Sequence, residues 1–274
     1  MAGVRVNGVG LFYETVGTGD PLVLVHGSWA DRRSWEQVLP DLAQEYRVLV
    51  YDRRGHSQSE RPARQGSRTE DEDDLGALLD ELGFAPAYVA GNSFGASIAL
   101  GLATRRPELF RGLIAHEPPL AGIVTGEPEL RPLMDATDQK IGSVLAHLRA
   151  GETQAGARLF VEEVALGPGA WEQLPEQVRE TFLRNAPTFL DEQKDPGWAA
   201  LDLTALSQFT GPALVTGGTA SPPWFATVTA RIADALPQAQ VHTFEGAGHI
   251  PHVTHPRDYV DAVTRFLRTA GGRR

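Results

Sequence analysis

Short apolar runs alternate with stretches of helical periodicity along most of the chain. Two runs rich in β-branched residues, 21–25 and 47–51, end at polar or glycine-containing turns, as strands buried on both faces of a parallel sheet do. Further strand-like runs occupy 87–90, 112–115, 212–216 and 240–244. Apolar residues at helical spacing lie at 35–42, 75–82, 96–103 and 256–267. This order predicts an α/β protein with right-handed crossovers.

The predicted helix over 75–82 is preceded by a start signal and by an acidic cluster. Thr69 is followed three residues later by Glu72, which is the spacing of a capping box, and Gly83 marks the end of the helix. Residues 70–74 are all acidic. Because negative charge suits the N-terminal end of a helix and charged side chains are usually exposed, we expect this cluster to be a solvated first turn.

The region 118–209 does not follow the alternating pattern. Strand-like runs are missing from it, and roughly 90 residues is too long for a plain crossover. It is helical in pattern and carries large apolar side chains, namely Met134, Leu145, Phe160, Trp171, Phe182, Phe189 and Trp198. We therefore predict a core domain formed by 1–117 and 210–274, and a mostly helical cap formed by 118–209.

Composition narrows the classes of partner and compartment. The 274 residues, 42% of them hydrophobic, suffice for one large domain or one domain with an insertion. A net charge of −10 argues against nucleic acid and anionic membrane surfaces as partners. The absence of cysteine excludes disulfides, thiolate metal sites and a cysteine nucleophile. Because the sequence has neither a signal-like start nor about 18 consecutive apolar residues, we expect a cytoplasmic protein. A homodimer stays possible.

The pentapeptide Gly91-Asn92-Ser93-Phe94-Gly95 is a G-x-S-x-G motif placed between a strand-like run and a helix-like run. A serine exposed at a sharp strand-to-helix turn needs flanking positions with almost no side chain, which the glycines provide. The motif therefore nominates Ser93 as a nucleophile. Taken alone, it also fits an ordinary glycine-rich turn that carries an incidental serine.

An acyl-transfer centre at Ser93 needs a base and an oxyanion site. A serine hydroxyl is a weak nucleophile until a histidine takes its proton, and His249 follows the last strand at the edge of the sheet where the elbow lies. His252 and His255 are its rivals, although His255 is better placed to start the terminal helix. The backbone N–H of Phe94, the residue after the nucleophile, is one expected oxyanion donor.

Four segments together make the chain resemble the α/β-hydrolase fold: 26–29, which reads His-Gly-Ser-Trp, 52–57, the elbow, and 246–249, which reads Gly-Ala-Gly-His. The resemblance covers nearly the whole chain. It implies a mostly parallel central sheet flanked by helices, with the cap inserted after the strand that follows the elbow. It also implies that Ser28 supplies the second oxyanion N–H, with Trp29 as the neighbouring candidate, and it supports His249 as the base. We expect structural, loop-fixing roles for His26, Asp52, Arg53, Arg54 and His56.

The catalytic acid is where the sequence departs from the common pattern of this fold. The loop 217–223, where most relatives carry an aspartate, has no carboxylate. Glu117 follows the strand 112–115, and a carboxylate at that strand end can reach His249 across the edge of the sheet. We therefore predict Glu117 as the acid that orients His249. Its alternative role is a turn cap before two prolines, in which case Asp135, Asp138 and Asp202 are the next candidates.

The position of this acid is similar to that in fungal-type zearalenone lactonases, which use a Ser-Glu-His triad. The matching positions are Ser93, the His-Glu-Pro-Pro run 116–119, and His249. Similarity extends to 217–225, where a Thr/Ser-Pro loop takes the place of the acid, and to 249–256. The resemblance implies the triad Ser93, Glu117 and His249.

Aromatic residues supply the argument about the substrate. The residues predicted to bind it are Trp29, Trp171, Phe189, Trp198 and Trp224. An apolar, aromatic-lined cleft suits a neutral hydrophobic small molecule, although the same residues also fit a cap core. Histidines and carboxylates show no metal-ligand spacing and no nucleotide motif is present, so no metal and no cofactor are expected.

The function predicted from these features is a serine hydrolase that cleaves a carboxylic ester or lactone of a neutral hydrophobic molecule through a Ser93 acyl-enzyme. Because a fold does not determine a function, two alternatives stay open. One is a non-hydrolytic enzyme on the same scaffold, such as a cyclase, a C–C lyase or a perhydrolase. The other is a ligand-sensing signalling protein that retains the triad.

Overall fold

A central β-sheet organises the protein, and the computed structural model describes residues 2–64 and 66–272. The sheet has eight strands in the order β1-β2-β4-β3-β5-β6-β7-β8 within these residues. The strands are β1 Ala2–Val6, β2 Val9–Val16, β3 Asp20–Val25, β4 Tyr46–Tyr51, β5 Ala87–Asn92, β6 Phe110–His116, β7 Ala213–Gly218 and β8 Ala239–Phe244. Strands β3 to β8 pair in parallel, and β2 pairs antiparallel with β1 and β4. The prediction of a mostly parallel sheet is confirmed.

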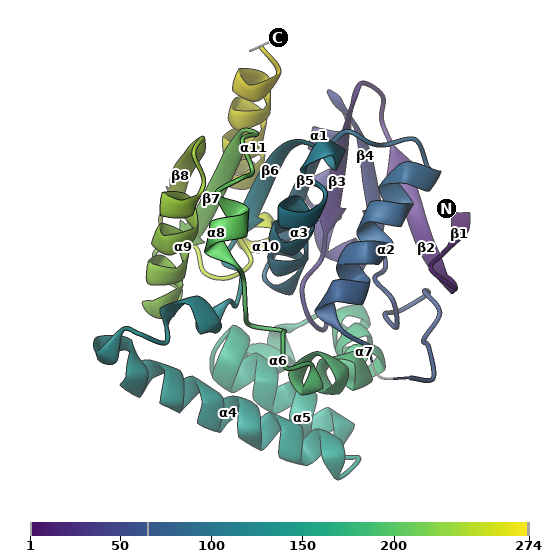
Figure 1. Ribbon diagram of the computed structural model, residues 1–274. Coiled ribbons are helices and arrows are strands. Elements are labelled where there is room, and N and C mark those ends of the chain that lie inside the picture. The colour runs from purple at the N-terminus through teal and green to yellow at the C-terminus, as the bar shows by residue number, and fades with distance from the viewer. Residues whose placement is uncertain (1, 65, 273–274) are drawn as a thin grey trace.

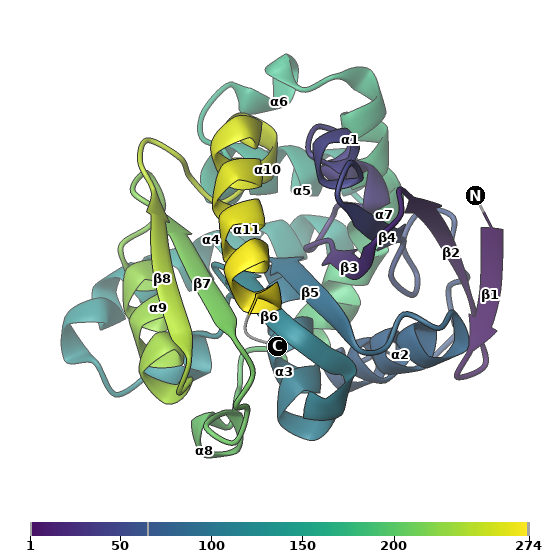
Figure 2. The same cartoon turned by 90° about the horizontal axis from the view of Figure 1, so that it is seen from above.

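Helices cover both faces of the sheet (Figure 1, Figure 2). One face carries α2 Arg68–Glu81, α3 Phe94–Arg105, α8 Leu203–Leu206 and α9 Trp224–Ala235, and the other carries α1 Leu39–Leu42 and α11 Pro256–Gly271, with α10 Pro251–Thr254 beside α11. Short 3₁₀ turns occupy Arg32–Trp35, Pro107–Leu109, Ala121–Val124 and Pro128–Leu130. In the described ranges, none of the helices combines the length and the apolar character that a membrane span requires.

The two faces of the sheet bury alternate residues of the same strands. In β3, Val23 and Val25 pack in the cluster beneath α2, α3 and α9, whereas Leu22 and Leu24 pack in the cluster beneath α11. A strand buried on both faces needs apolar residues at every position, which explains why the strand signals in the sequence are continuous runs. This sheet positions the loops at its carboxyl edge.

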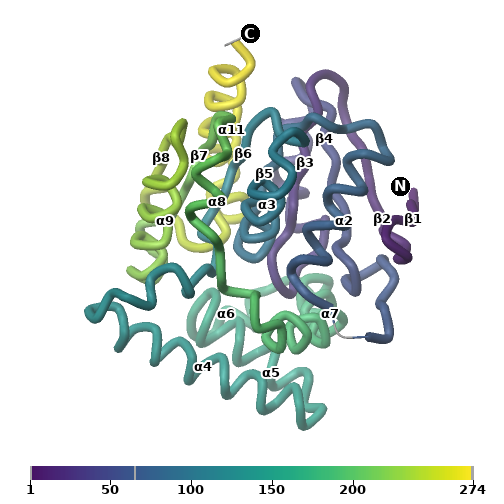
Figure 3. The backbone as a smooth tube through the Cα atoms, in the orientation of Figure 1, coloured from purple at the N-terminus to yellow at the C-terminus, as the bar shows by residue number. Residues whose placement is uncertain are grey.

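The cap lies at the edge of the sheet where β6 ends, as Figures 1 and 3 show. It contains α4 Arg131–Arg149, α5 Thr153–Leu159, the π-helical turn Phe160–Ala165, α6 Ala170–Gln173 and α7 Glu176–Lys194. These helices enclose their own apolar cluster, which confirms a helical cap inserted after β6. Leu206 and Phe209 instead pack with the sheet cluster, and the domain boundary at 209 stays a prediction.

The prediction of an exposed acidic turn at 70–74 is wrong in two respects. The cap of α2 is Ser67, whose side chain accepts a hydrogen bond from the Glu70 N–H, and not Thr69. Asp71, Glu72 and Asp74 are buried. Each pairs with arginine: Asp71 with Arg53, Asp74 with Arg54, and Glu72 with Arg68 and Arg105. A buried carboxylate is retained only where such partners compensate its lost hydration.

Three further elements differ from those predicted from the sequence. The helix expected over 35–42 is divided into the 3₁₀ turn Arg32–Trp35 and the single-turn helix α1. The hairpin β1–β2 carries partly exposed residues on an edge of the sheet, so it lacks the long apolar run by which the other strands are recognised. Helix α9 begins directly behind two prolines, within the segment read as a loop.

Candidate active site

The nucleophile candidate lies at a strained turn between β5 and α3. Ser93 has φ 55° and ψ −125°, a conformation that residues with a side chain rarely adopt. A Cβ added to Gly91 would lie 2.4 Å from the carbonyl oxygen of Gly95, and one added to Gly95 would lie 2.2 Å from that of Val25. Both glycines are therefore required by close backbone contact, as the elbow interpretation expects.

His249 and Glu117 form a hydrogen-bonded pair beside this elbow. The Nδ1 atom of His249 lies 2.8 Å from Oε2 of Glu117. In the sheet, Asn92 of β5 is in register with His116 of β6, so Ser93 and Glu117 follow at the same edge. The Asn92 side-chain amide donates to the His249 carbonyl oxygen at 2.8 Å. These contacts attach His249 both to the acid candidate and to the strand that carries the nucleophile.

Glu117 is held as a buried, ionised carboxylate. Only 1% of its side chain is exposed, against 21% for His249. Its Oε1 accepts from the Gly218 N–H at 2.8 Å, and its Oε2 accepts from the Ser221 hydroxyl at 2.8 Å. Burial alone raises a carboxyl pKa, but the hydrogen bond from His249 and the neighbouring histidines outweigh it, so the pKa of Glu117 lies below its ordinary value.

The backbone of Glu117 supports a functional interpretation of that carboxylate. Its φ is 42°, in the left-handed region that non-glycine residues seldom occupy. Strain of this kind costs on the order of 1–3 kcal/mol and gathers at functional sites. A residue whose only task is to cap a turn before two prolines does not need this conformation.

The other candidate acids and bases have different surroundings. Asp202 caps α8 by accepting from two backbone N–H groups of that helix, and Asp135 and Asp138 are exposed on α4. His252 is buried against aromatic side chains of the α11 layer, and His255 is the N-cap residue of α11, as expected. Of the five, none has a hydrogen bond to His249 among the described residues.

The segments predicted to supply the oxyanion donors border Ser93. Phe94 is the first residue of α3. On the other side, a Cβ added to Gly27 would lie 3.0 Å from Cβ of Ser93, so the turn that leads to Ser28 touches the nucleophile. The Ser28 hydroxyl donates to Oε2 of Glu192 in cap helix α7 at 2.6 Å. The oxyanion roles of Ser28 and Phe94 stay predictions.

A buried polar network fixes the loops beneath these donors. His26 accepts the Arg53 N–H at Nε2, 3.0 Å away. The Arg53 guanidinium is fully buried and pairs with Glu192 at 2.6 Å and Asp71 at 3.1 Å. Asp52 accepts from the backbone N–H and the guanidinium of Arg32. These contacts fit the loop-fixing roles expected for this set, which also includes Arg54, paired with Asp74, and His56, bound to Thr188.

The aromatic residues predicted to bind substrate divide into two groups. Trp29 is fully buried and stacks on Phe160 of the cap at 4.9 Å between ring centres. Phe189 and Trp171 are buried in the same cap cluster, and Trp198 packs against the sheet cluster. Trp224 stacks on Phe225, whose ring centre lies 4.8 Å from that of His249. The ring adjacent to His249 is thus Phe225, and the substrate roles of Trp29, Trp171, Phe189, Trp198 and Trp224 stay predictions.

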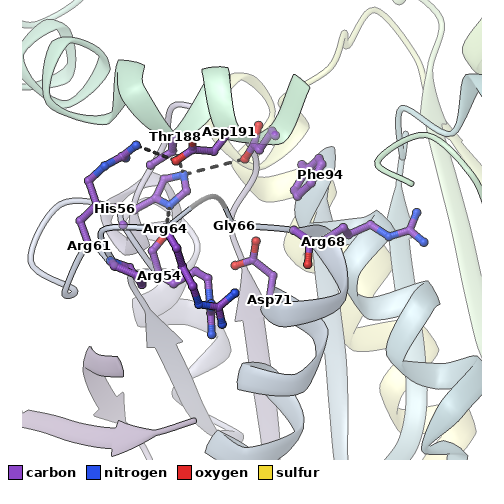
Figure 4. Close-up of a pocket in the computed structure, with 14 residues that line it drawn as sticks. Arg54, His56, Arg61, Arg64, Gly66, Arg68, Asp71, Phe94, Thr188 and Asp191 are labelled. Atoms are coloured by element: carbon purple, nitrogen blue, oxygen red, sulfur yellow. Dashed lines mark hydrogen bonds and ion pairs between the residues drawn. The ribbon is translucent and has the colours of Figure 1, made fainter. Parts of the chain in front are cut away.

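A pocket of about 440 Å³, counting the space open to solvent, adjoins the Phe94 side chain (Figure 4). Charged side chains are among those that line it. Three arginines of this wall form ion pairs: Arg54 with Asp74, Arg61 with Asp191, and Arg68 with Glu72. The first two of these ion pairs connect the loop after β4 with α2 and with cap helix α7, and the third lies within α2.

Some residues of the site have no usable sequence signal. Glu192 contacts Ser28 across 164 positions of the chain, so no local pattern connects them. Asn92 occupies the variable position of the motif. Ser221 did have a signal, because it stands in the loop from which the usual acid is missing.

Buried histidines make the stability of the fold dependent on pH. Burial lowers the pKa values of His26, His116 and His252 to about 3, with the Arg53 charge adding to the effect at His26. The unfolded chain binds these protons below about pH 6.5, whereas the folded protein does not. The stabilisation is therefore present above pH 6.5 and is lost as the pH falls toward 3.

We expect the free energy of unfolding to fall between pH 6.5 and 4 by about 1.4 kcal/mol per pH unit for each proton that the unfolded chain binds and the folded protein does not. These three histidines contribute about three protons, and His56, whose pKa burial also lowers well below its ordinary value, contributes about one more. Asp71 reduces this loss of stability by about one proton, because burial raises its folded pKa to about 7 and the folded protein then binds a proton that the unfolded chain does not. Urea titrations across this range measure the slope. The variant His252→Phe, which preserves the aromatic packing, should reduce it by about one proton; a stability that is flat over this range would contradict the assignment.

The chain is similar to known proteins over most of its length and not only at the candidate site. A family model described as "Alpha/beta hydrolase family" matches residues 22–262. The chain is 30% identical, over 98% of its length and 92% of the relative's, to 2-hydroxymuconate semialdehyde hydrolase of Pseudomonas sp. (strain CF600). It is 40% identical, over 45% of its length, to the uncharacterized hydrolase YraK of Bacillus subtilis (strain 168), and the match spans 46% of that protein. The crystal structure of the enol-lactonase from Burkholderia xenovorans LB400 shares the fold, with a TM-score of 0.80 and 21% identity over 97% of this chain and 100% of that one.

Proposed function

The chain belongs to the alpha/beta hydrolase family, and from this membership we propose that it is a serine hydrolase that cleaves a carboxylic ester or lactone through a Ser93 acyl-enzyme. The observation that carries the proposal is the 2.8 Å contact between His249 Nδ1 and the Glu117 carboxylate beside the strained elbow of Ser93. Nucleophile, base and orienting carboxylate are the three parts of a Ser-His-acid centre.

In the acylation step, His249 accepts the Ser93 hydroxyl proton at Nε2 while Oγ attacks the substrate carbonyl carbon. Glu117 holds the other ring nitrogen in its protonated tautomer and stabilises the imidazolium that forms. The backbone N–H groups of Phe94 and Ser28 donate to the developing oxyanion. His249 then gives its proton to the leaving alkoxide, which departs as the alcohol or, from a lactone, stays attached to the acyl chain.

In the deacylation step, His249 takes a proton from water as the water attacks the acyl-enzyme carbonyl. Collapse of the second tetrahedral intermediate returns the proton to Ser93 and releases the carboxylic acid. No cofactor enters either step.

We propose that the substrate is neutral and hydrophobic. The Phe225 ring beside His249 supplies an apolar wall, with Trp224 stacked behind it. The net charge of −10 disfavours anionic substrates on average. The position of the acid, similar to that in zearalenone lactonases, favours a lactone, and the enol-lactonase shows that a protein of similar fold takes one.

The test combines covalent labelling with a substrate panel. We expect a fluorophosphonate probe to label the protein once, with the mass increase located on the peptide that contains Ser93. We expect turnover of neutral p-nitrophenyl esters and aromatic lactones of graded size. A protein that is not labelled would contradict the nucleophile, and a labelled protein that hydrolyses nothing on the panel would favour a non-hydrolytic reaction.

A further inference from the structure

The loop from Gly217 to Pro223 contributes a polar group to the site despite having no carboxylate. It connects β7 to α9 at the edge of the sheet where Ser93 and Glu117 lie. Ser221 in this loop donates its hydroxyl proton to Oε2 of Glu117 at 2.8 Å. The same oxygen lies 2.8 Å from Nδ1 of His249. Ser221 and His249 are therefore both hydrogen-bonded to the same carboxylate oxygen.

The loop is built closely around the Glu117 carboxylate. The Gly218 N–H donates to Oε1 at 2.8 Å. A Cβ on Gly218 would lie 2.2 Å from the Ala247 carbonyl oxygen, so this loop packs directly against the segment that leads to His249. The Ser221 N–H donates to the Gly218 carbonyl at 3.2 Å, which closes the turn that aims the hydroxyl at Glu117.

A glutamate at this position needs such external positioning. Its carboxylate rotates about a broad terminal torsion, and the side chain has one more rotatable bond than an aspartate has. The Gly218 N–H fixes one oxygen, and the Ser221 hydroxyl fixes the other at the place where it meets Nδ1. Hydrogen bonds to an ionised acceptor are the strong ones, so each donor restricts the carboxylate appreciably.

We propose that Ser221 is a positioning residue of the triad, which holds Oε2 of Glu117 against His249. The loop that carries the acid in most relatives thus serves here as a donor to an acid on the neighbouring strand. The inference rests on the proposed Ser93 hydrolase function and deepens it. Ser221 acts through Glu117 and does not touch the reacting atoms in this assignment.

The experiment compares Ser221→Ala, which removes the hydroxyl, with Ser221→Thr, which retains it. With the best ester of the panel, we expect Ser221→Ala to lower kcat roughly tenfold to a hundredfold, the size of one hydrogen bond to a charged group, with KM little changed. Ser221→Thr should restore most of kcat. Ser207→Ala is the matched control, because that hydroxyl donates only within α8 and its flanking turn, to the Thr204 carbonyl.

A proton resonance separates positioning from a general loss of structure. The His249 Nδ1–H bonded to a carboxylate gives a far-downfield signal, which we expect in the parent and in Ser221→Thr, and expect to move or broaden in Ser221→Ala. Parental kcat and an unmoved signal in Ser221→Ala would overturn the role of Ser221. If Ser93→Ala is inactive at the same time, the hydrolase function stands and only the positioning role falls; an active Ser93→Ala removes the function itself.

Discussion

Replacing Ser93 with alanine is expected to lower kcat for ester hydrolysis by on the order of 10⁶-fold, the scale seen when the nucleophile of a Ser-His-acid triad is removed. The acyl-enzyme cannot form without the Ser93 Oγ, because His249 then has no hydroxyl proton to accept. The residual rate should come from oxyanion donors and substrate binding alone. Steady-state kinetics with a p-nitrophenyl ester and titration of covalent labelling measure the two consequences independently.

Two variants control for the backbone strain at this position. Alanine must adopt the φ of 55° that Ser93 has, so Ser93→Gly, which tolerates it without a Cβ penalty, should be equally inactive and better folded. Ser97→Ala, in the same helix α3, should retain parental activity, because that buried hydroxyl has no hydrogen-bond partner in the described part of the chain. Substantial hydrolysis by both Ser93 variants would exclude the acyl-enzyme mechanism.

Predictions from the sequence succeeded where the determining interactions are local. The continuous apolar runs of β3 and β5 reflect burial on both faces of the sheet, and the glycines around Ser93 reflect contacts with backbone atoms of the turn and of β3. The position of Glu117 at this edge could be predicted for a related reason, since parallel strands end at one edge and β5 and β6 are neighbours; its role as the acid stays a prediction. Chain order and strand pairing together reduce the choice of acid to a few loops.

Predictions failed where long-range ion pairs decide the outcome. The sequence at 70–74 shows five acidic residues in a row, which locally resemble a solvated turn. It does not show that Arg53 and Arg54 come from the loop after β4 to neutralise Asp71 and Asp74, or that Arg105 of α3 reaches Glu72. Burial of charge depends on such distant partners, so helical periodicity and composition cannot reveal it.

The directions of aromatic side chains near the candidate site also depend on contacts between distant parts of the chain. Trp29 is next to the oxyanion segment in the sequence, yet its ring is buried among Phe160, Phe182 and Phe189 of the cap. Proximity in the chain to the predicted oxyanion segment does not by itself determine the direction of the side chain. Phe225 lies 132 positions after Ser93 in the chain. Its ring reaches the His249 ring only because α9 starts at this edge of the sheet.

Glu117→Gln is expected to lower kcat by up to ~10⁴-fold, by analogy with the loss of a triad carboxylate. The hydrogen-bond donors around Glu117 explain why an isosteric amide fails. The Gly218 N–H can only donate, so the amide oxygen must face it, and the amide NH₂ then faces His249. An N–H aimed at Nδ1 selects the tautomer whose proton is on Nε2, and that tautomer cannot accept the Ser93 proton.

Glu117→Gln should therefore show two signatures that a structural role would not produce. KM should change little while kcat falls, and nitrogen NMR of His249 should show the proton moved from Nδ1 to Nε2. Glu245→Gln is the matched control, because Glu245 is an exposed carboxylate close to His249 in sequence whose contact is with Thr219. If Glu117→Gln keeps parental kcat and the parental tautomer, Glu117 is a turn cap and not the acid of the triad.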